Sequence, residues 1–507
     1  MICFIFFISF FSLCKSFIFH SMINAGFEAF PTTNRKPRNR FSLVPLSIST
    51  TAGSIEVGNH DECLRRIEKI FVLSDLHTDH KANLSWLRDR YHDNKKAGIN
   101  VPGEKDALII AGDISHQPSL IKKTLKLIRE QYKCVIFFIF GNHEAWIHGS
   151  EMDGIGLESS LKKLELVSEI CQDLDGVYTH VDGGILVGDR EQAYLGDETV
   201  THCENSPCWI LPLQSWYDGS LAIDGCQDLC TNFEHWPWVD FNRCAWPSQH
   251  YYRPNSIGPL LNKTGLFGVN ASKIPLGLNN IFLKRNEVSI AQVRQHLAKC
   301  HQFEQDQFNA NVTRNNTKKG RNVGLVTFSH FLPNQQCLPD WKNVTSVNFD
   351  RTNWLDHGAG KTSCKFALVA GSQSLDAQIR SITNEKLSVI DDKKLVFDEQ
   401  QQHIHVFGHS HRPKDFNLSG VRYVHNPLGS PRERESHMIT ECPEFQLIWD
   451  TRSTEGQIYA KKPLIRYWEE HGGGLDYMRA YFDHRKLERA RKLEEVRQTL
   501  LEDGIIL

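Results

Sequence analysis

Short apolar segments of this chain end abruptly in Asp, Asn or His, and they do so in a fixed order. Ile70–Leu73, Ala107–Ile110 and Cys134–Phe140 are continuous apolar runs, which suit strands that are buried on both faces. Ser119–Gln131 and Ser159–Leu174 carry apolar residues at helical spacing. This order of strands and helices predicts an α/β chain with functional residues at the carboxyl ends of its strands.

The polar residues at these strand ends are of the types that bind metal ions. They are Asp75 and His77, Asp113, Asn142 and His143, His330, and His409 and His411. Alternate residues of an extended chain point the same way, so Asp75 and His77 are expected to chelate, and His409 and His411 repeat the same spacing. Mixed carboxylate, amide and imidazole ligands favour Mn, Fe or Zn over Ca. Seven or more ligands are too many for one ion and suit two ions about 3.5–4 Å apart with one bridging carboxylate.

The blocks DxH, GD, GNH[DE], an isolated His and GHxH make the chain similar to the calcineurin-like metallophosphoesterases. The resemblance implies ligands for two ions that share one carboxylate: Asp75, His77 and His411 for one ion, Asn142, His330 and His409 for the other, and Asp113 as the bridge. A metal-bound hydroxide would attack the phosphoester. His143 would donate a proton to the leaving group or stabilise the transition-state charge, so Asp113 and His143 are the expected catalytic residues.

The chain is most similar to a poorly characterised plant and algal group of that superfamily. The similarity lies in Ser74–Asp79, Leu213–Asp218, Trp238–Phe241 and Val424–Arg434. It implies a layered αββα sandwich with two mixed sheets, here expected over residues 66–440. The part from about 190 to 320 loses the strand and helix rhythm and is rich in Trp, Cys, Pro and Asn, so we expect a capping insertion of irregular structure.

Departures from better-known branches narrow the expected substrate. Gly112-Asp113 is not followed by the Asp-Arg-Gly of phosphoprotein phosphatases, and no Tyr lies between Asp113 and Tyr132 as a purple acid phosphatase ligand would. A small phosphomonoester or phosphodiester is therefore the expected substrate. Candidate substrate contacts are His80, Asn83, His116, Trp146 and Arg434. Two alternatives stay open: a nucleotide phosphodiesterase or nuclease with the same site, and a catalytically silent binding or scaffold protein of this fold.

Charge and cysteine content exclude some classes of protein. The 58 basic and 60 acidic side chains nearly cancel, so no global positive field favours bulk nucleic-acid binding. Fourteen cysteines are too few in 507 residues for a disulfide scaffold. Those between Cys203 and Cys244 either form disulfides in an oxidising compartment or are free thiols in a reducing one. The sequence does not indicate an oligomeric state.

Both ends of the chain differ from the centre in composition. The apolar run Ile2–Cys14 predicts a signal peptide over residues 1–25, and residues 26–60 are basic and acid-poor like a transit peptide or a disordered linker. The two together resemble the bipartite presequence of algae with secondary plastids, so plastid targeting is our first expectation, with a secreted or lumenal protein as the alternative. No transmembrane segment is expected in the mature chain. Residues 441–507 are expected to be an extension that ends in a charged helix.

Overall fold

The computed structural model describes residues 60–97, 101–147, 159–189, 206–247, 274–311, 323–339, 341, 360–384, 402–435, 437–440, 443–453, 455–459, 464 and parts of 483–498. All of them belong to one of the two units into which the chain divides, the one that begins at Val57. The expected signal peptide and nearly all of the transit-like segment lie outside the described residues. In the described ranges, no helix is both long and apolar enough to cross a membrane.

The first sheet has five strands in the order β11-β1-β2-β3-β4. Their bounds are β1 Lys69–Leu73, β2 Asp106–Ala111, β3 Val135–Ile139, β4 Val177–Tyr178 and β11 Gln446–Asp450. Strands β1 to β4 are parallel, and β11 pairs antiparallel with β1. The carboxyl ends of β1, β2 and β3 therefore meet at one edge of the sheet, as the sequence predicted.

The second sheet has six strands in the order β5-β6-β7-β8-β10-β9. Their bounds are β5 Ile185–Val187, β6 Cys208–Pro212, β7 Gly324–Phe328, β8 His403–Val406, β9 Lys414–Leu418 and β10 Val421–His425. The four inner strands β6, β7, β8 and β10 are parallel, and the edge strands β5 and β9 pair antiparallel with their neighbours.

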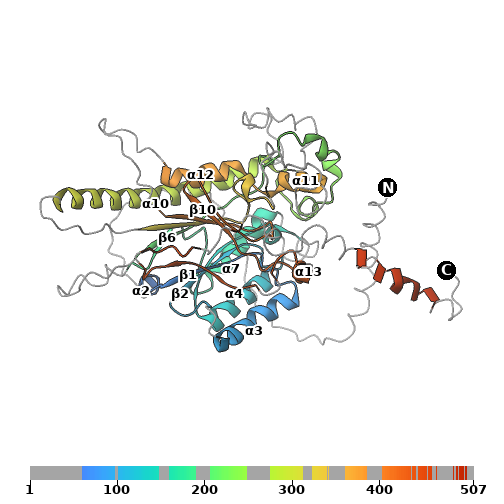
Figure 1. The fold of residues 1–507 in the computed structure, drawn as a ribbon, viewed down its shortest axis with the longest axis horizontal. Helices are drawn as coiled ribbons and strands as arrows, with labels where there is room; N and C mark the ends of the chain where they lie inside the picture. The colour runs from blue at the N-terminus through green and yellow to red at the C-terminus, as the bar shows by residue number, and fades with distance from the viewer. Residues whose placement is uncertain are drawn as a thin grey trace, which may run out of the picture. The chain divides into compact units, whose positions relative to one another are not determined.

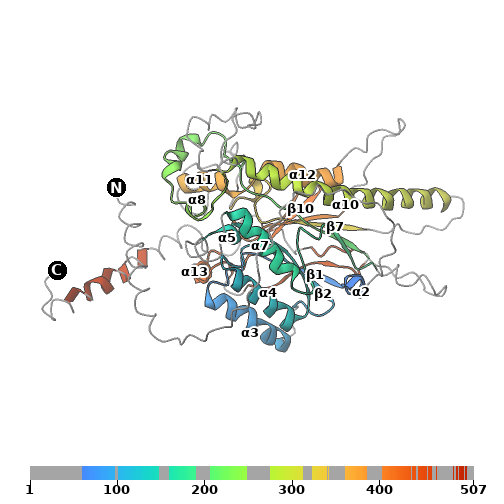
Figure 2. The same cartoon turned by 180° about the vertical axis from the view of Figure 1, so that it is seen from behind.

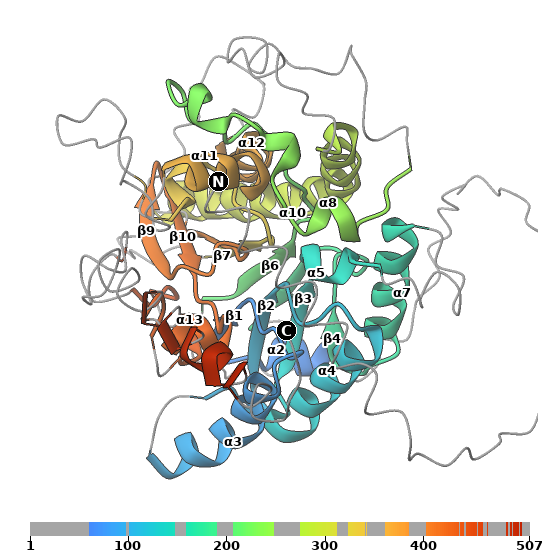
Figure 3. The same cartoon turned by 90° about the vertical axis from the view of Figure 1, so that its right-hand side faces the viewer.

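The two sheets stack face to face between two layers of helices (Figure 1). The first sheet is covered by α3 Lys81–Ala97, α4 Pro118–Tyr132 and α7 Ser160–Gln172, and the second by α10 Leu276–Asn311, α11 Gly360–Ala370 and α12 Gln373–Asn384. Figure 2 shows the same layers from behind, and Figure 3 shows β1, β2 and β3 beside β6 and β7. The remaining short elements are α2 His60–Arg65, α5 Asn142–Ala145, η2 Gln227–Cys230, η3 Phe233–His235, α8 Asp240–Arg243, η6 Gln335–Cys337 and α13 Pro431–Glu435. The expected αββα fold is confirmed as a mixed α/β sandwich with two mainly parallel sheets.

Strand residues alternate between two hydrophobic clusters, which explains why the strands are continuously apolar. Ile70 and Val72 of β1 belong to the cluster between the sheets, whereas Phe71 and Leu73 belong to the cluster that includes the apolar face of α4. Trp449 of β11 is fully buried between the sheets, and its Nε1 donates to the Ser206 carbonyl at 2.9 Å.

A glycine is required where the Trp449 ring packs against β7 of the second sheet. A Cβ on Gly324 of β7 would lie 2.0 Å from the Trp449 ring, far inside van der Waals contact. No other residue type could stand at this position without moving the indole.

Part of the expected insertion at about 190–320 differs from the prediction. Cys208–Pro212 forms β6, an inner strand of the second sheet, and Leu276–Asn311 forms α10, which covers that sheet. The five-residue run CWILP is buried, but the sequence did not predict a strand here because the run begins with Cys and ends with Pro. The expected domain end at 440 is also too early, because β11 lies beyond it and pairs with β1. Described residues between 483 and 498 are helical, as the expected charged helix requires.

Candidate metal centre

The backbone adopts a left-handed conformation at five of the predicted ligands: Asp75 (φ 52°), His77 (40°), Asp113 (56°), His409 (73°) and His411 (52°). Non-glycine residues rarely adopt this conformation, and each such residue costs on the order of 1 kcal/mol or more unless its surroundings enforce it. The sequence prediction assumed an extended backbone at Asp75 and His77, and this assumption was wrong. The strands end before these residues. Left-handed turns place Asp75, His77 and His411 in one group of ligands and His409 in the other.

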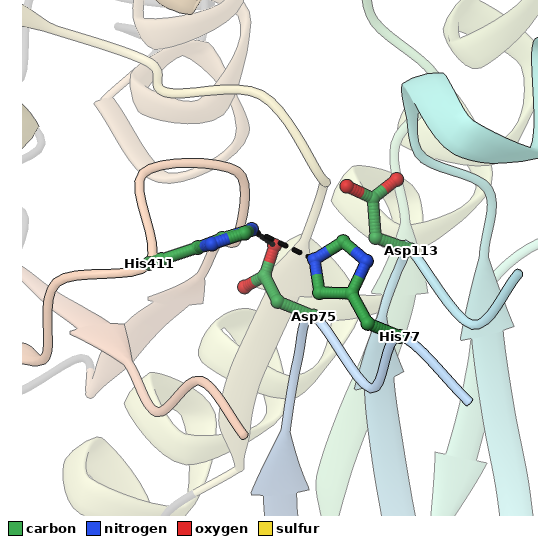
Figure 4. A group of neighbouring side chains, drawn as sticks. All are labelled: Asp75, His77, Asp113 and His411. Atoms are coloured by element: carbon green, nitrogen blue, oxygen red, sulfur yellow. Dashed lines mark hydrogen bonds and ion pairs between the residues drawn. The ribbon is translucent and has the colours of Figure 1, made fainter. Parts of the chain in front are cut away.

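Four predicted ligands form one group. Atoms of Asp75, His77, Asp113 and His411 lie within 4.8 Å of one another. His77 Nε2 lies 2.8 Å from His411 Nε2, and the latter lies 3.5 Å from Asp75 Oδ1 (Figure 4). Asp75 is completely buried, and its Oδ2 also accepts hydrogen bonds from the Ser74 hydroxyl at 2.6 Å and from His425 Nε2 at 3.0 Å.

A second group lies on the other side of Asp113. Asn142 Oδ1, His330 Nε2 and His409 Nδ1 form a triangle whose sides are 3.1, 3.1 and 3.2 Å. Asp113 Oδ2 lies 3.4 Å from His330 Nε2. Asp113 is thus the residue common to both groups, as a bridging carboxylate would be.

Hydrogen bonds on the far side of three imidazoles fix which nitrogen faces the centre with a lone pair. His330 Nδ1 donates to the Ala111 carbonyl at 2.9 Å, and His409 Nε2 donates to the Val369 carbonyl at 3.1 Å. His411 Nδ1 donates to Glu433 Oε2 at 2.8 Å. In their neutral forms, all three rings therefore present a lone pair to the centre, which is the state that a metal ion requires.

The amide of Asn142 is oriented in the same sense. Its Nδ2 donates to Asp240 Oδ1 at 2.9 Å, so its carbonyl oxygen faces His330 and His409. Three acceptor atoms then meet with no hydrogen between them, and only a metal ion or a proton can relieve their repulsion. The donor set of two nitrogens and an amide oxygen, with a carboxylate alongside, fits a divalent first-row metal ion.

The pKa values of the metal-free centre also indicate that the site favours positive charge. Burial lowers the pKa of His330, but Asp113, Asp75 and the Ala111 carbonyl together raise it to about 9. Burial likewise lowers the pKa of His411, while Glu433 and Asp75 raise it to about 9. Burial alone would raise the pKa of Asp113, yet the neighbouring His330 and His143 hold it well below its usual value. At neutral pH one protonated imidazole thus stands in each group.

Glu144, the last residue of the GNHE block, holds two strand ends together. Its carboxylate is completely buried and accepts four backbone N–H groups: those of Gly141 at 2.6 Å, Asp113 at 3.1 Å, Ile114 at 2.7 Å and Ser115 at 3.2 Å. Burial and the nearby Asp113 charge raise the pKa of Glu144 to about 7. Sequence reasoning assigned no role to Glu144, Asp240 or Glu433, because their partners lie on other segments.

His143 lies beside the centre without being one of the seven ligand candidates. Its Nε2 is 3.8 Å from Asp113 Oδ2, and its ring packs against Trp146 with 3.6 Å between centroids. Burial lowers the pKa of His143 to about 3, so the ring is neutral at pH 7. The buried Nδ1 has no hydrogen-bond partner among the described residues, which favours a proton on Nε2, the nitrogen that faces the centre.

The structure separates the five candidate substrate contacts into two sets. Trp146 packs against His143, which lies beside the centre. His116 lies next to Trp146, with 6.3 Å between ring centroids, and its Nδ1 is 3.2 Å from Asp79 Oδ1. His80 is exposed at the start of α3.

Asn83 and Arg434 contact backbone carbonyls near the ligands and each other. Asn83 is completely buried and donates to the carbonyls of Leu76 and Gly429. The Arg434 guanidinium donates to the Leu428 carbonyl at 2.7 Å and to Asn83 Oδ1 at 2.6 Å. Both side chains are engaged in holding the Gly429 loop against the start of α3, so they position the backbone near the ligands.

Comparison with known proteins agrees with this arrangement. Residues 68–206 match the family model of the calcineurin-like phosphoesterases. The crystal structure of phosphopantetheinyl hydrolase (PptH) from Mycobacterium tuberculosis is similar with a TM-score of 0.41 and 16% identity, over 75% of this chain and 96% of that chain. No curated protein matches the sequence. The expected link to a plant and algal group stays a prediction. The part that matches the calcineurin-like phosphoesterase model, residues 68–206, thus carries Asp75, Asp113 and Asn142.

Proposed function

We propose that this protein is a metal-dependent phosphoesterase that hydrolyses a small phosphomonoester or phosphodiester at a centre for two metal ions. The triangle of Asn142 Oδ1, His330 Nε2 and His409 Nδ1 carries the proposal, because in their neutral forms these groups place three acceptors within 3.2 Å of one another, and a cation is needed between them. Asp75, His77 and His411 would hold the other ion, and Asp113 would contact both. Mn, Fe and Zn suit these ligands.

Two metal ions held by these residues would polarise the phosphoryl group and make a water-derived nucleophile available near neutral pH. The chain's own contribution is to hold the reacting groups and to exclude other arrangements. Asp113 Oδ1 accepts the backbone N–H of His143 at 3.0 Å, which fixes the imidazole beside the carboxylate. Because His143 is neutral, its Nε2–H would act as a hydrogen-bond donor to the phosphoryl or leaving-group oxygen.

The test is hydrolysis of p-nitrophenyl phosphate and bis-p-nitrophenyl phosphate by the full chain supplied with Mn²⁺, Zn²⁺ or Fe²⁺. Metal bound per chain is measured in parallel by elemental analysis after dialysis. Asp113→Asn removes the charge shared by both groups and is expected to abolish turnover. Asp89→Asn is the matched control, because Asp89 is an exposed carboxylate on α3 whose one ion-pair partner among the described residues is its neighbour Arg88.

The outcomes separate the alternatives. Metal-dependent turnover that disappears in the Asp113 variant and persists in the Asp89 variant supports the proposal, and the preferred substrate distinguishes a monoesterase from a diesterase. Two bound ions without turnover of these esters or of nucleotide phosphodiesters would favour a silent binding protein. A wild-type chain that binds no metal would refute the proposed centre.

A further inference from the structure

We propose that Asp240 sets the affinity of the ion on the Asn142 side of the centre. Asp240 begins α8, in the segment expected to cap the domain, and it is 98 residues away from Asn142 in sequence. This inference rests on the proposed metal centre. It assigns Asp240 as a positioning residue, since the carboxylate acts on the ion through Asn142 and not by contact.

Hydrogen bonds to both oxygens fix the orientation of the Asp240 carboxylate. Oδ1 accepts the amide N–H of Asn142 at 2.9 Å and the indole N–H of Trp146 at 2.6 Å, and Oδ2 accepts the indole N–H of Trp238 at 3.0 Å. Three donors therefore converge on one buried side chain: Asn142 and Trp146 lie on α5 and at its end, and Trp238 is two residues from Asp240 in sequence. Rotation of the Asn142 amide would break the first bond and turn its NH₂ group toward His330 and His409.

The charge of Asp240 has no cationic side chain to balance it. No arginine or lysine forms an ion pair with Asp240 in the part of the chain that the structure describes, and its three partners are all neutral donors. A buried carboxylate without a counter-charge is costly. A cation held by Asn142 Oδ1 would lie on the far side of the same amide, where it would compensate this charge and be stabilised by it.

Glu433 stands in the same relation to the other group of ligands. It accepts His411 Nδ1–H at 2.8 Å, while His411 Nε2 faces Asp75 and His77. Carboxylates placed behind ligands in this way commonly change metal affinity by about 10–100-fold. The two halves of the centre thus have separate outer carboxylates, and Glu433 provides an internal comparison for Asp240.

The experiment measures Mn²⁺ bound per chain against free Mn²⁺ in the metal-depleted full-length protein. Asp240→Asn keeps the shape of the side chain but removes its charge, and it sets an NH₂ group against one of the three donors. It is introduced into His411→Ala, which leaves the Asn142 side intact, and into His330→Ala, which leaves the Asp75 side intact. Glu433→Gln is the matched variant and is placed in the His330→Ala background.

We expect Asp240→Asn to weaken Mn²⁺ binding by about 10–100-fold in the His411→Ala background and by less than about threefold in the His330→Ala background. Glu433→Gln should weaken Mn²⁺ binding by a similar factor in the His330→Ala background. Equal effects of Asp240→Asn in both backgrounds, or no effect in either, would overturn the inference.

Two controls keep the result interpretable. Thermal unfolding of each metal-depleted variant reports whether the domain still folds, and Asp240→Ser replaces Asp240→Asn if the latter does not, with the same expected asymmetry. A wild-type chain that binds no Mn²⁺, Zn²⁺ or Fe²⁺ refutes the proposed function. A wild-type chain that binds two ions, with Asp240 variants that bind both equally well, refutes only the role of Asp240.

Discussion

Glu144→Gln should destabilise the domain severely although it changes a single atom. The Glu144 carboxylate accepts four backbone N–H groups, two on each oxygen. A glutamine retains one oxygen and turns an NH₂ group toward the other two N–H groups. Each buried N–H left without an acceptor costs about 1–3 kcal/mol. The expected loss is therefore about 2–6 kcal/mol, and the Gly141 and Asp113 turns should separate.

Urea unfolding of the metal-depleted protein at pH 8, followed by tryptophan fluorescence, measures this loss directly. Glu165→Gln is the control, because Glu165 is half-exposed on α7 and pairs only with Lys162 in the described structure. That substitution should change the free energy of unfolding by less than about 0.5 kcal/mol. If Glu144→Gln costs less than about 1 kcal/mol, or no more than the control, the carboxylate does not hold the two turns together.

Four further results are expected. His143→Ala should lower kcat by about 10²–10⁴-fold and leave the metal bound per chain unchanged, and a loss of metal would show that the imidazole is a ligand instead. Gly141→Ala should reduce the metal bound, because the new Cβ would lie 2.2 Å from Asp113 Oδ1. Metal affinity should fall about tenfold per pH unit below pH 9, since an ion must displace the proton of His330, and a flat profile in dialysis measurements would contradict this. Burial lowers the pKa of His403 to about 3, so stability is lost as pH falls below about 6.5. The loss should reach about 2 kcal/mol at pH 5 and be smaller in His403→Gln, as urea unfolding at both pH values can check.

The ligand candidates could be predicted because each one immediately follows a buried strand. Apolar runs place β1, β2, β3, β7 and β8, and the first polar residues beyond them must lie at the carboxyl edges of the sheets. The conformation of those residues could not be predicted. Nothing in the spacing of Asp75 and His77 indicates a left-handed backbone, because the surrounding loops enforce it through contacts distant in sequence.

The outer residues of the centre escaped prediction for a related reason. Glu144, Asp240 and Glu433 act by accepting hydrogen bonds from groups on other segments, and an acidic residue has the same local signature whether it is solvated or buried. The contacts that Asn83 and Arg434 make could not be predicted for the same reason. Their polar atoms are taken up by backbone carbonyls and by each other, which no local pattern reveals.

Strand β11 has a consequence for how the protein is made. During synthesis, β1 leaves the ribosome nearly 400 residues before Gln446–Asp450 can pair with it. Until then the nascent chain presents the open edge of a buried parallel strand, which is a site for mispairing with other chains. His411 also follows Asp75 by more than 300 residues, so the first group of ligands can assemble only late in translation. Chaperone retention of the nascent chain is therefore expected to end when the residues of β11 emerge.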